Sequence, residues 1–164
     1  MNKSFHRRLT TNFIVTIVLF LCLNLLISYF IFKDYYVSEI KENLTHQAYL
    51  AADIISSTYI EDDDNYLQQI SNKIARDTGL RVTVIDAADG NVMADSGFDS
   101  HIMEPHKSRP EIFKALKGES GTDIRFSDTA GQYLLYAAIP FKTDTFSGVL
   151  RLAKPLKEIQ NVLL

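Results

Sequence analysis

The feature that most constrains this sequence is an uncharged, apolar run near its amino terminus. No Asp, Glu, Lys or Arg occurs among the 23 residues from Thr10 to Phe32. As an α-helix rising about 1.5 Å per residue, the run is roughly 34 Å long, which is enough to cross a hydrocarbon core of about 30 Å. Residues 10–32 are therefore predicted to form a transmembrane helix, and the lipid bilayer is the first predicted partner.

The charges on the two sides of this run predict its orientation. Residues 1–9 contain three of the 17 Lys and Arg residues and no acid, whereas all 20 Asp and Glu residues follow Phe32. Because basic flanks stay on the cytoplasmic side, residues 1–9 are predicted to be a cytoplasmic tail and residues 33–154 an extracytoplasmic domain. The protein is thus expected in the cell membrane as a single-pass chain.

A cleaved signal peptide is the competing interpretation of this amino terminus. However, the run is longer than the apolar core of a signal peptide, which usually has about 7–15 residues. Bulky residues also occupy positions 31–36, where a peptidase requires small ones. An uncleaved anchor is therefore favoured. The only cysteine, Cys22, lies inside the run, so the external domain has no disulfide and depends on a hydrophobic core.

The periodicity after the run changes from helical to strand-like at Gly79. Apolar residues recur every three or four positions from Ile40 to Tyr59, which predicts that the first helix continues out of the membrane as one rod. Asp64 is predicted to cap a second helix that ends at Gly79. Two-residue alternation and turn sequences then predict strands over 80–85, 92–95, 120–127, 131–139 and 147–153.

A short helix is predicted between the second and third strands. Ser108 to Glu111 reads as a capping box with proline at the first helical position, and Gly118 ends the helix after Lys117. The complete order of helices and strands predicts an α+β domain, in which a five-stranded antiparallel sheet packs against the two long helices. Residues 155–164 are predicted to begin a helix that leads to a second transmembrane segment.

Several local sequences, in order, resemble one family of membrane receptors. The segments that carry the resemblance are Val84–Gly90, Asp95–Ser96, Arg109–Glu111, Ala115–Gly118, Tyr136–Pro140 and Gly148–Ala153. They resemble the extracytoplasmic sensor region of bacterial membrane histidine kinases, particularly the phosphate-regulon sensor kinase type. The resemblance implies a single PAS-like, Cache-type domain behind an uncleaved anchor.

The resemblance also implies a function in signalling. It predicts the sensing input module of a two-component system, whose full-length parent is an ATP-dependent protein histidine kinase that reaches its response regulator through a kinase core. No phosphoacceptor helix and no nucleotide-binding loop occur in this sequence, so the chain is expected to be non-catalytic and either a fragment or a truncated reading of a longer gene. The ligand-binding region of a chemoreceptor and a membrane-tethered interaction domain without signalling output remain alternatives.

Strand alternation predicts a binding face. If the aliphatic residues of each strand face the long helices, then Arg81, Arg125 and Arg151 point to the opposite face. Guanidinium groups there suit a small anionic ligand, a carboxylate or a phosphate. The site is predicted to contain Arg125, Arg151, Arg109 and Tyr136, the last from a segment that carries the resemblance. The alternative is that these arginines pair with acids such as Asp123 or Asp95.

Other candidate sites carry weaker signals. His101, Glu104 and His106 lie in an irregular loop and suggest either metal ligands or a pH switch, but solvent-exposed loop residues are the favoured interpretation. No nucleophile motif, zinc motif or metal site is found, so no catalytic residue, metal or cofactor is predicted. The external domain is acidic, which argues against nucleic acid. A homodimer is expected through the first helix, where Ile40, Leu44 and Ile55 are predicted to serve both the core and a partner copy. A protein partner in place of a small ligand stays open.

Overall fold

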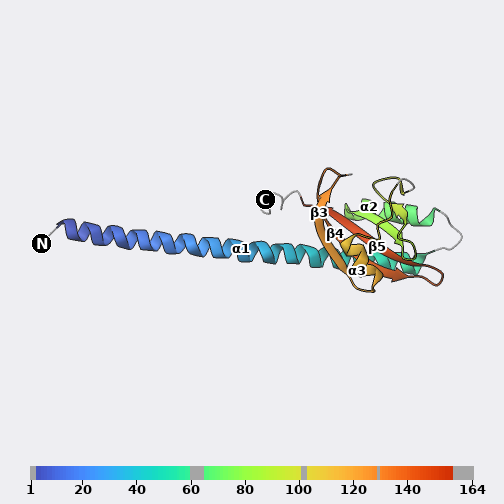
Figure 1. The fold of residues 1–164 in the computed structure, drawn as a ribbon, viewed down its shortest axis with the longest axis horizontal. Coiled ribbons are helices and arrows are strands. Elements are labelled where there is room, and N and C mark those ends of the chain that lie inside the picture. Colours follow the sequence, from blue (N-terminus) through green and yellow to red (C-terminus); the bar gives the residue numbers. More distant parts are fainter. Residues whose placement is uncertain (1–2, 60–64, 101–102, 129, 157–164) are drawn as a thin grey trace. The chain divides into compact units, whose positions relative to one another are not determined.

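The computed structural model describes residues 3–59, 65–100, 103–128 and 130–156. The chain divides into two compact units, Met1–Glu39 and Ile40–Leu164. Helix α1 (Lys3–Thr58) is one continuous helix that belongs to both units, as the sequence predicts (Figure 1). Neither a proline nor a glycine occurs within it, so nothing in the backbone chemistry interrupts its hydrogen bonds.

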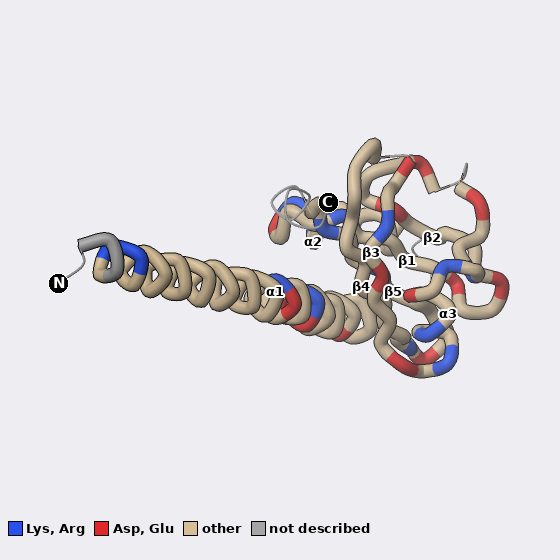
Figure 2. Tube along the Cα trace, turned by 60° about the vertical axis from the view of Figure 1, so that its left-hand side comes forward, with Lys and Arg blue, Asp and Glu red and all other residues tan. Residues whose placement is uncertain are grey.

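The first unit consists of the amino-terminal part of α1. Among the described residues, α1 is the one helix that is long and apolar enough to cross a membrane, and its most apolar stretch has no buried side chain. Figure 2 shows this stretch as an uncharged segment with charged residues at both ends. These properties agree with the predicted span, while its bounds at 10 and 32 stay a prediction.

The second unit is built around one antiparallel sheet of five strands. The strands are β1 (Arg81–Asp86), β2 (Val92–Asp95), β3 (Gly121–Ser127), β4 (Gln132–Lys142) and β5 (Ser147–Pro155). Their order across the sheet is β2-β1-β5-β4-β3, so the first and last strands in the sequence pair at the centre. The α+β architecture with a five-stranded antiparallel sheet is therefore confirmed. The observed β5 ends two residues later than predicted, and most of the helix expected over 155–164 lies outside the described residues.

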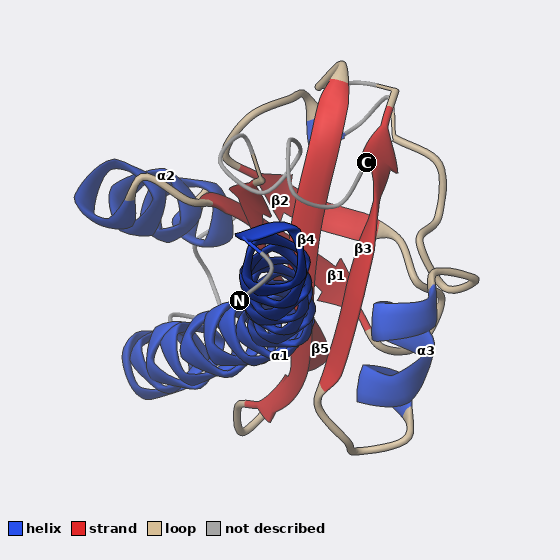
Figure 3. Ribbon diagram, turned by 90° about the vertical axis from the view of Figure 1, so that its left-hand side faces the viewer, coloured by secondary structure: helices blue, strands red, loops and turns tan. Residues whose placement is uncertain are grey.

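Helices cover both faces of this sheet. The part of α1 from residue 40 onward and α2 (Tyr66–Thr78) lie on one side, and α3 (Pro110–Leu116) lies on the other (Figure 3). On the side of α1 and α2, the sheet presents fully buried aliphatic residues such as Val82, Val84 and Leu150. α3 packs Ile112 and Ala115 against the opposite face. This second face also carries the charged residues of the strands, so α3 lies beside the candidate site.

The buried face of α1 matches the predicted helical face but overturns the predicted dimer contact. Leu44, Ala48, Ala51 and Ile55 are buried in the described structure. Leu44 and Ile55 serve the core, as predicted, but the expectation that they also contact a partner copy is wrong, because the domain's own core covers both side chains. A residue that is already buried within one protomer has no exposed apolar surface left to bury against a second protomer.

A matched pair of isoleucines tests this orientation of α1. Replacement of the buried Ile55 by Val is expected to lower the free energy of unfolding by about 0.5–1.5 kcal/mol, because a methylene is lost from a closed core. Replacement of the neighbouring Ile54, which is 45% exposed, is expected to change it by less than about 0.5 kcal/mol. Equal losses in urea denaturation would show that α1 is rotated from the position described.

Two predicted helix caps differ from the structure. The N-cap of α2 is Asn65, and the predicted cap, Asp64, lies outside the described residues. α3 has Arg109 at its N-cap position with extended backbone and no side-chain capping bond, so the predicted capping box does not form. Instead of turning back to the helix start, Glu111 pairs with arginines of the sheet. A charged partner in the tertiary structure is a stronger ligand for this carboxylate than a local backbone amide.

Candidate ligand-binding site

Three arginines of the sheet lie on the face that carries α3, as the alternation predicts. Arg81 is on β1, Arg125 on β3 and Arg151 on β5. The register places Thr83 of β1 directly opposite Arg151, and Thr83 also opposite Asp95 of β2. Side chains from four strands therefore meet in one polar layer.

Glu111 is the acid at the centre of this layer, and it is completely buried. Arg125 donates two hydrogen bonds to it, from Nη1 to Oε2 at 2.8 Å and from Nη2 to Oε1 at 2.9 Å. Arg125 also donates to the Asp123 carboxylate at 2.7 Å. The Nη1 atom of Arg151 lies 3.7 Å from the Oε1 atom of Glu111. One buried carboxylate thus serves two guanidinium groups.

A second acid, Asp95, holds Arg81. The Nε atom of Arg81 donates to the Asp95 carboxylate at 3.0 Å, and Thr83 Oγ1 donates to the same carboxylate at 2.7 Å. The backbone amides of Gly97 and Phe98 donate to Asp95 as well. The pairing of arginines with Asp95 and Asp123 that the sequence offered as the alternative therefore occurs for Arg81 and Arg125.

Arg151 is the exception, because its charge is poorly compensated. The residue is 3% exposed, and its Nη2 atom donates to Thr83 Oγ1 at 3.1 Å. The Nε atom is buried and has no hydrogen-bond partner among the described residues. Burial lowers the pKa of Arg151 to about 10, with Glu111 opposing the shift and Arg81 adding to it. A buried donor without an acceptor costs about 1–3 kcal/mol.

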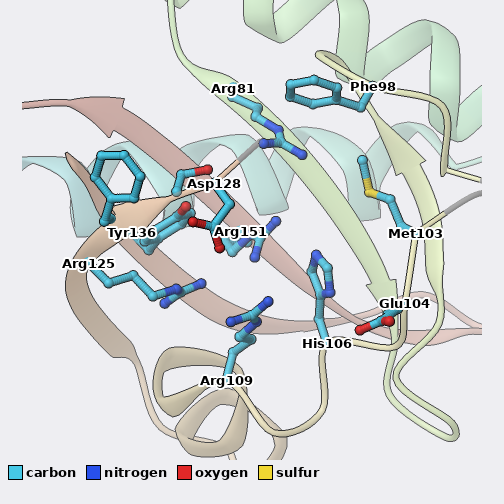
Figure 4. A pocket seen from close by; sticks show the side chains of 12 residues that line it. Arg81, Phe98, Met103, Glu104, His106, Arg109, Arg125, Asp128, Tyr136 and Arg151 are labelled. Carbon is cyan, nitrogen blue, oxygen red and sulfur yellow. The ribbon is translucent and has the colours of Figure 1, made fainter. Parts of the chain in front are cut away.

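The arginines border a cavity of about 270 Å³. Figure 4 shows their side chains around a common space, with His106 between Arg109 and Arg151. Tyr136 forms part of the wall, its ring 3.9 Å below the guanidinium of Arg125 and 5.1 Å from that of Arg151. Phe98, Met103 and Phe126 add apolar surface. A cavity of this size suits a ligand smaller than the drug-sized molecules that fill roughly 300–1,000 Å³.

The loop before α3 closes one side of the cavity and is fixed to the β1–β2 turn. The backbone amide of His106 donates to the carbonyl of Gly90 at 2.9 Å, and Lys107 Nζ donates to the carbonyl of Ala88 at 3.1 Å. Gly90 has φ +82°, and a Cβ there would lie 2.8 Å from the Lys107 Cβ. The turn therefore needs glycine both for its backbone angle and for the close approach of this loop.

His106 is a cavity residue that the sequence interpretation did not select. It is half-buried, and burial lowers its pKa from 6.5 to about 4, helped by the charges of Arg151 and Arg109. The expectation of an exposed loop residue is wrong for His106. Its predicted neighbour His101 lies outside the described residues, and no group of metal-binding side chains occurs in the described part of the chain.

All four predicted site residues line this one cavity: Arg109, Arg125, Tyr136 and Arg151. The structure adds Arg81, which strand alternation had placed on the same face, and Glu104, His106 and Asp128 from loops. No local sequence pattern marks the loop residues, because their approach depends on how the loop is folded over the sheet. Glu111 was assigned to a helix cap, and only its partners in space reveal its place in the polar layer.

Comparisons with known proteins place this fold among sensory domains. No protein-family model and no curated protein matches the sequence. Among solved structures, the ligand-binding domain of the Campylobacter jejuni chemoreceptor Tlp3 in complex with 4-methylisoleucine has a TM-score of 0.65 at 15% identity, over 82% of this chain and 59% of that one. The sensor domain of the V. cholerae histidine kinase DctB has a TM-score of 0.65 at 19% identity, over 82% of this chain and 56% of that one.

The E. coli DcuS sensor domain is similar over almost its whole length. Its TM-score is 0.56 at 17% identity, over 75% of this chain and 96% of that one. By contrast, the chain spans less than two thirds of the Tlp3 and DctB structures. These similarities give no support to the phosphate-regulon type in particular. They show that residues of this chain adopt the Cache, PAS-like fold found in sensor domains of both chemoreceptors and histidine kinases.

Proposed function

We propose that this chain is the extracytoplasmic input module of a membrane sensor histidine kinase, and that it binds a small anionic ligand in the arginine-lined cavity. The apolar stretch of α1 supports the membrane anchor, and the basic tail supports a cytoplasmic amino terminus. The fold is shared with sensor domains that are named as parts of chemoreceptors and histidine kinases. The kinase core that would complete the signalling protein belongs to a part outside this chain.

The observation that carries the ligand proposal is the state of Arg151. Its Nε–H faces no acceptor among the described residues although the residue is almost fully buried beside a cavity. Arg109, on the rim of the same cavity, makes no ion pair within the described part of the chain. A carboxylate or phosphate oxygen between them would complete charge-assisted hydrogen bonds.

The strand that binds the ligand also contacts the helix side of the domain, which supports a mechanism of transmission. On β5, Arg151 points to the cavity, whereas Leu150 and Leu152 are fully buried on the opposite face of the sheet. That face carries α1 and α2 (Figure 3). A ligand that favours one position of β5 shifts a two-state equilibrium, and the continuous α1 carries the change along its axis.

A chemoreceptor is the second candidate, because a chemoreceptor domain shares this fold at the same TM-score as a histidine kinase domain. The coding sequence beyond residue 164 distinguishes the histidine kinase, the chemoreceptor and a tethered interaction domain. A histidine kinase core supports our proposal, a methyl-accepting coiled coil supports the chemoreceptor, and a stop codon supports a tethered interaction domain. In each case we expect a homodimer, and the surface that α1 leaves for a second copy includes Tyr49 and Leu50.

A thermal-shift screen of the full chain in detergent tests the ligand proposal, with small mono- and dicarboxylates and inorganic phosphate as probes. A ligand at about 100 times its Kd stabilises the folded state by about 2.7 kcal/mol. Replacement of Arg151 by Gln is expected to weaken binding by about 10- to 100-fold, because a charged hydrogen bond contributes about 1.5–3 kcal/mol.

Two further variants make this result specific. Arg109→Gln changes an exposed residue and leaves the buried polar layer intact, so it is expected to weaken binding without lowering stability. Arg76→Gln on the exposed surface of α2 is the matched control and is expected to bind normally. Unchanged binding in both Arg151→Gln and Arg109→Gln would refute the assignment of the ligand to this cavity.

A further inference from the structure

His106 is the one histidine among the described residues that line the cavity. Its backbone is held by Gly90, while its ring points into the cavity between Arg109 and Arg151 (Figure 4). The Nδ1 atom is buried and has no hydrogen-bond partner among the described residues. The side chain is thus placed by its backbone, and the other ring nitrogen, Nε2, is at the tip of the ring that enters the cavity.

The charges around His106 come from every element that borders the cavity. The cations are Arg81 of β1, Arg125 of β3, Arg151 of β5 and Arg109 at the start of α3. Tyr136 of β4 and the carboxylates of Glu104 and Asp128 complete the titratable lining. The buried acids Asp95 and Glu111 are already engaged by Arg81 and Arg125. Positive charge therefore dominates at His106, and it disfavours a protonated imidazole.

We propose that His106 is a ligand-binding residue that takes up a proton when an anion enters the cavity, so that this site binds its ligand more tightly in acidic medium. This inference rests on the proposed ligand site. An anion between Arg151 and Arg109 compensates the positive charges of these arginines, which otherwise keep His106 neutral. The protonated imidazole then donates to the anion from Nε2.

The sign of the pH dependence follows from linkage. In the ligand-free protein, burial and the neighbouring arginines hold the pKa of His106 near 4. The anion raises this pKa, so the complex binds more protons than the free protein between the two values. Within that window affinity rises roughly tenfold for each unit by which pH falls. Above the pKa of the complex, and below about 4, affinity is independent of pH.

The inference also restricts the chemistry of the ligand. The group beside His106 must keep its negative charge in the acidic range where the histidine becomes protonated, and it must offer an oxygen acceptor to Nε2. Carboxylates of low pKa, sulfonates and phosphate esters meet both requirements. A cationic ligand meets neither, because it would add to the repulsion from Arg151 and Arg109.

Isothermal titration calorimetry of the full chain in detergent tests proton uptake, in buffers of different ionisation enthalpy. Sulfate is the first probe because its charge is constant over the range from about pH 5 to about pH 7, and tartrate, whose carboxyl groups have low pKa values, is the carboxylate probe. We expect fractional proton uptake at about pH 5.5 and about tenfold tighter binding at pH 5 than at pH 7. NMR titration of the histidine Cε1–H resonances with and without sulfate measures the shift directly.

Two histidine variants test whether the proton uptake and the pH dependence of binding come from His106. His106→Gln keeps a polar side chain that does not titrate, and it is expected to abolish both the proton uptake and the pH dependence. His46→Gln removes an exposed histidine of α1 and is expected to leave both unchanged.

The outcomes distinguish the two proposals. Binding without proton uptake, or proton uptake that persists in His106→Gln, refutes the role of His106 but does not contradict the proposed ligand site. If neither probe binds at any pH, both the role of His106 and the proposed anion site are refuted.

Discussion

Replacement of Glu111 by Gln is expected to lower the free energy of unfolding of the extracytoplasmic unit by about 3–5 kcal/mol. Glutamine has nearly the same size, so no cavity is created. What is lost is the negative charge that the half-buried Arg125 and the buried Arg151 share, at 2.8 and 2.9 Å from Arg125 and 3.7 Å from Arg151. The two guanidinium groups would keep their positions with one formal charge fewer to balance them.

The measurement is thermal and urea unfolding of the full chain in detergent, followed by near-ultraviolet circular dichroism. This signal reports the packing of aromatic side chains such as Tyr136 and does not record the backbone helicity of α1. For a domain of this size, such a loss lowers Tm by roughly 10 °C or more. Glu119→Gln, which changes an exposed acid just after α3, is the matched control and is expected to shift Tm by less than about 2 °C. Equal Tm values for the two variants would contradict the central role of Glu111.

Gly121→Ala is expected to destabilise the unit for a different reason. A Cβ at position 121 would lie 2.2 Å from the carbonyl oxygen of Glu111 and 2.7 Å from its Cα. Both are backbone atoms of α3, so no side-chain rotation relieves the overlap. The helix must move away from β3, and it takes Glu111 and Arg109 with it. Overpacking of this kind costs about 1–3 kcal/mol, and more where backbone is displaced.

The same substitution is expected to impair ligand binding, because α3 and its first residues supply one wall of the cavity. Gly97→Ala is the matched control near the site. Its Cβ would meet the Arg81 side chain at 3.4 Å, an ordinary contact, so stability is expected to change by less than about 0.5 kcal/mol. If both alanine variants unfold at the same denaturant concentration, the close contact between α3 and β3 is not as described.

The strands and helices were predictable because their signals are local. Alternation over 80–85 and 147–153 predicted which residues face the helices, and the buried Val82 and Leu150 confirm it. The helical spacing from Leu44 to Ile55 predicted the buried face of α1 in the same way. In both cases apolar surface must leave water, and the period of the pattern identifies the element that achieves this.

The ion pairs of the site were predictable only in part. Strand alternation placed the arginines on one face and offered Asp95 and Asp123 as their partners, which the structure bears out. It did not find Glu111, because the sequence around Pro110 has the form of a capping box and gives that carboxylate a local explanation. The partner that prevails, Arg125, lies 14 residues further along the chain.

Sequence by itself determined the apolar helix, the antiparallel sheet and the shared face of the arginines, because each follows from the period of polar and apolar residues along one segment. Tertiary structure alone decided that the Nε atom of Arg151 has no partner in the described part of the chain and that His106 enters the cavity. Those facts depend on strand register, on the seating of α3 against Gly121 and on the loop held by Gly90. Charge compensation in a buried layer is set by distances between segments far apart in the chain, and no local pattern encodes those distances.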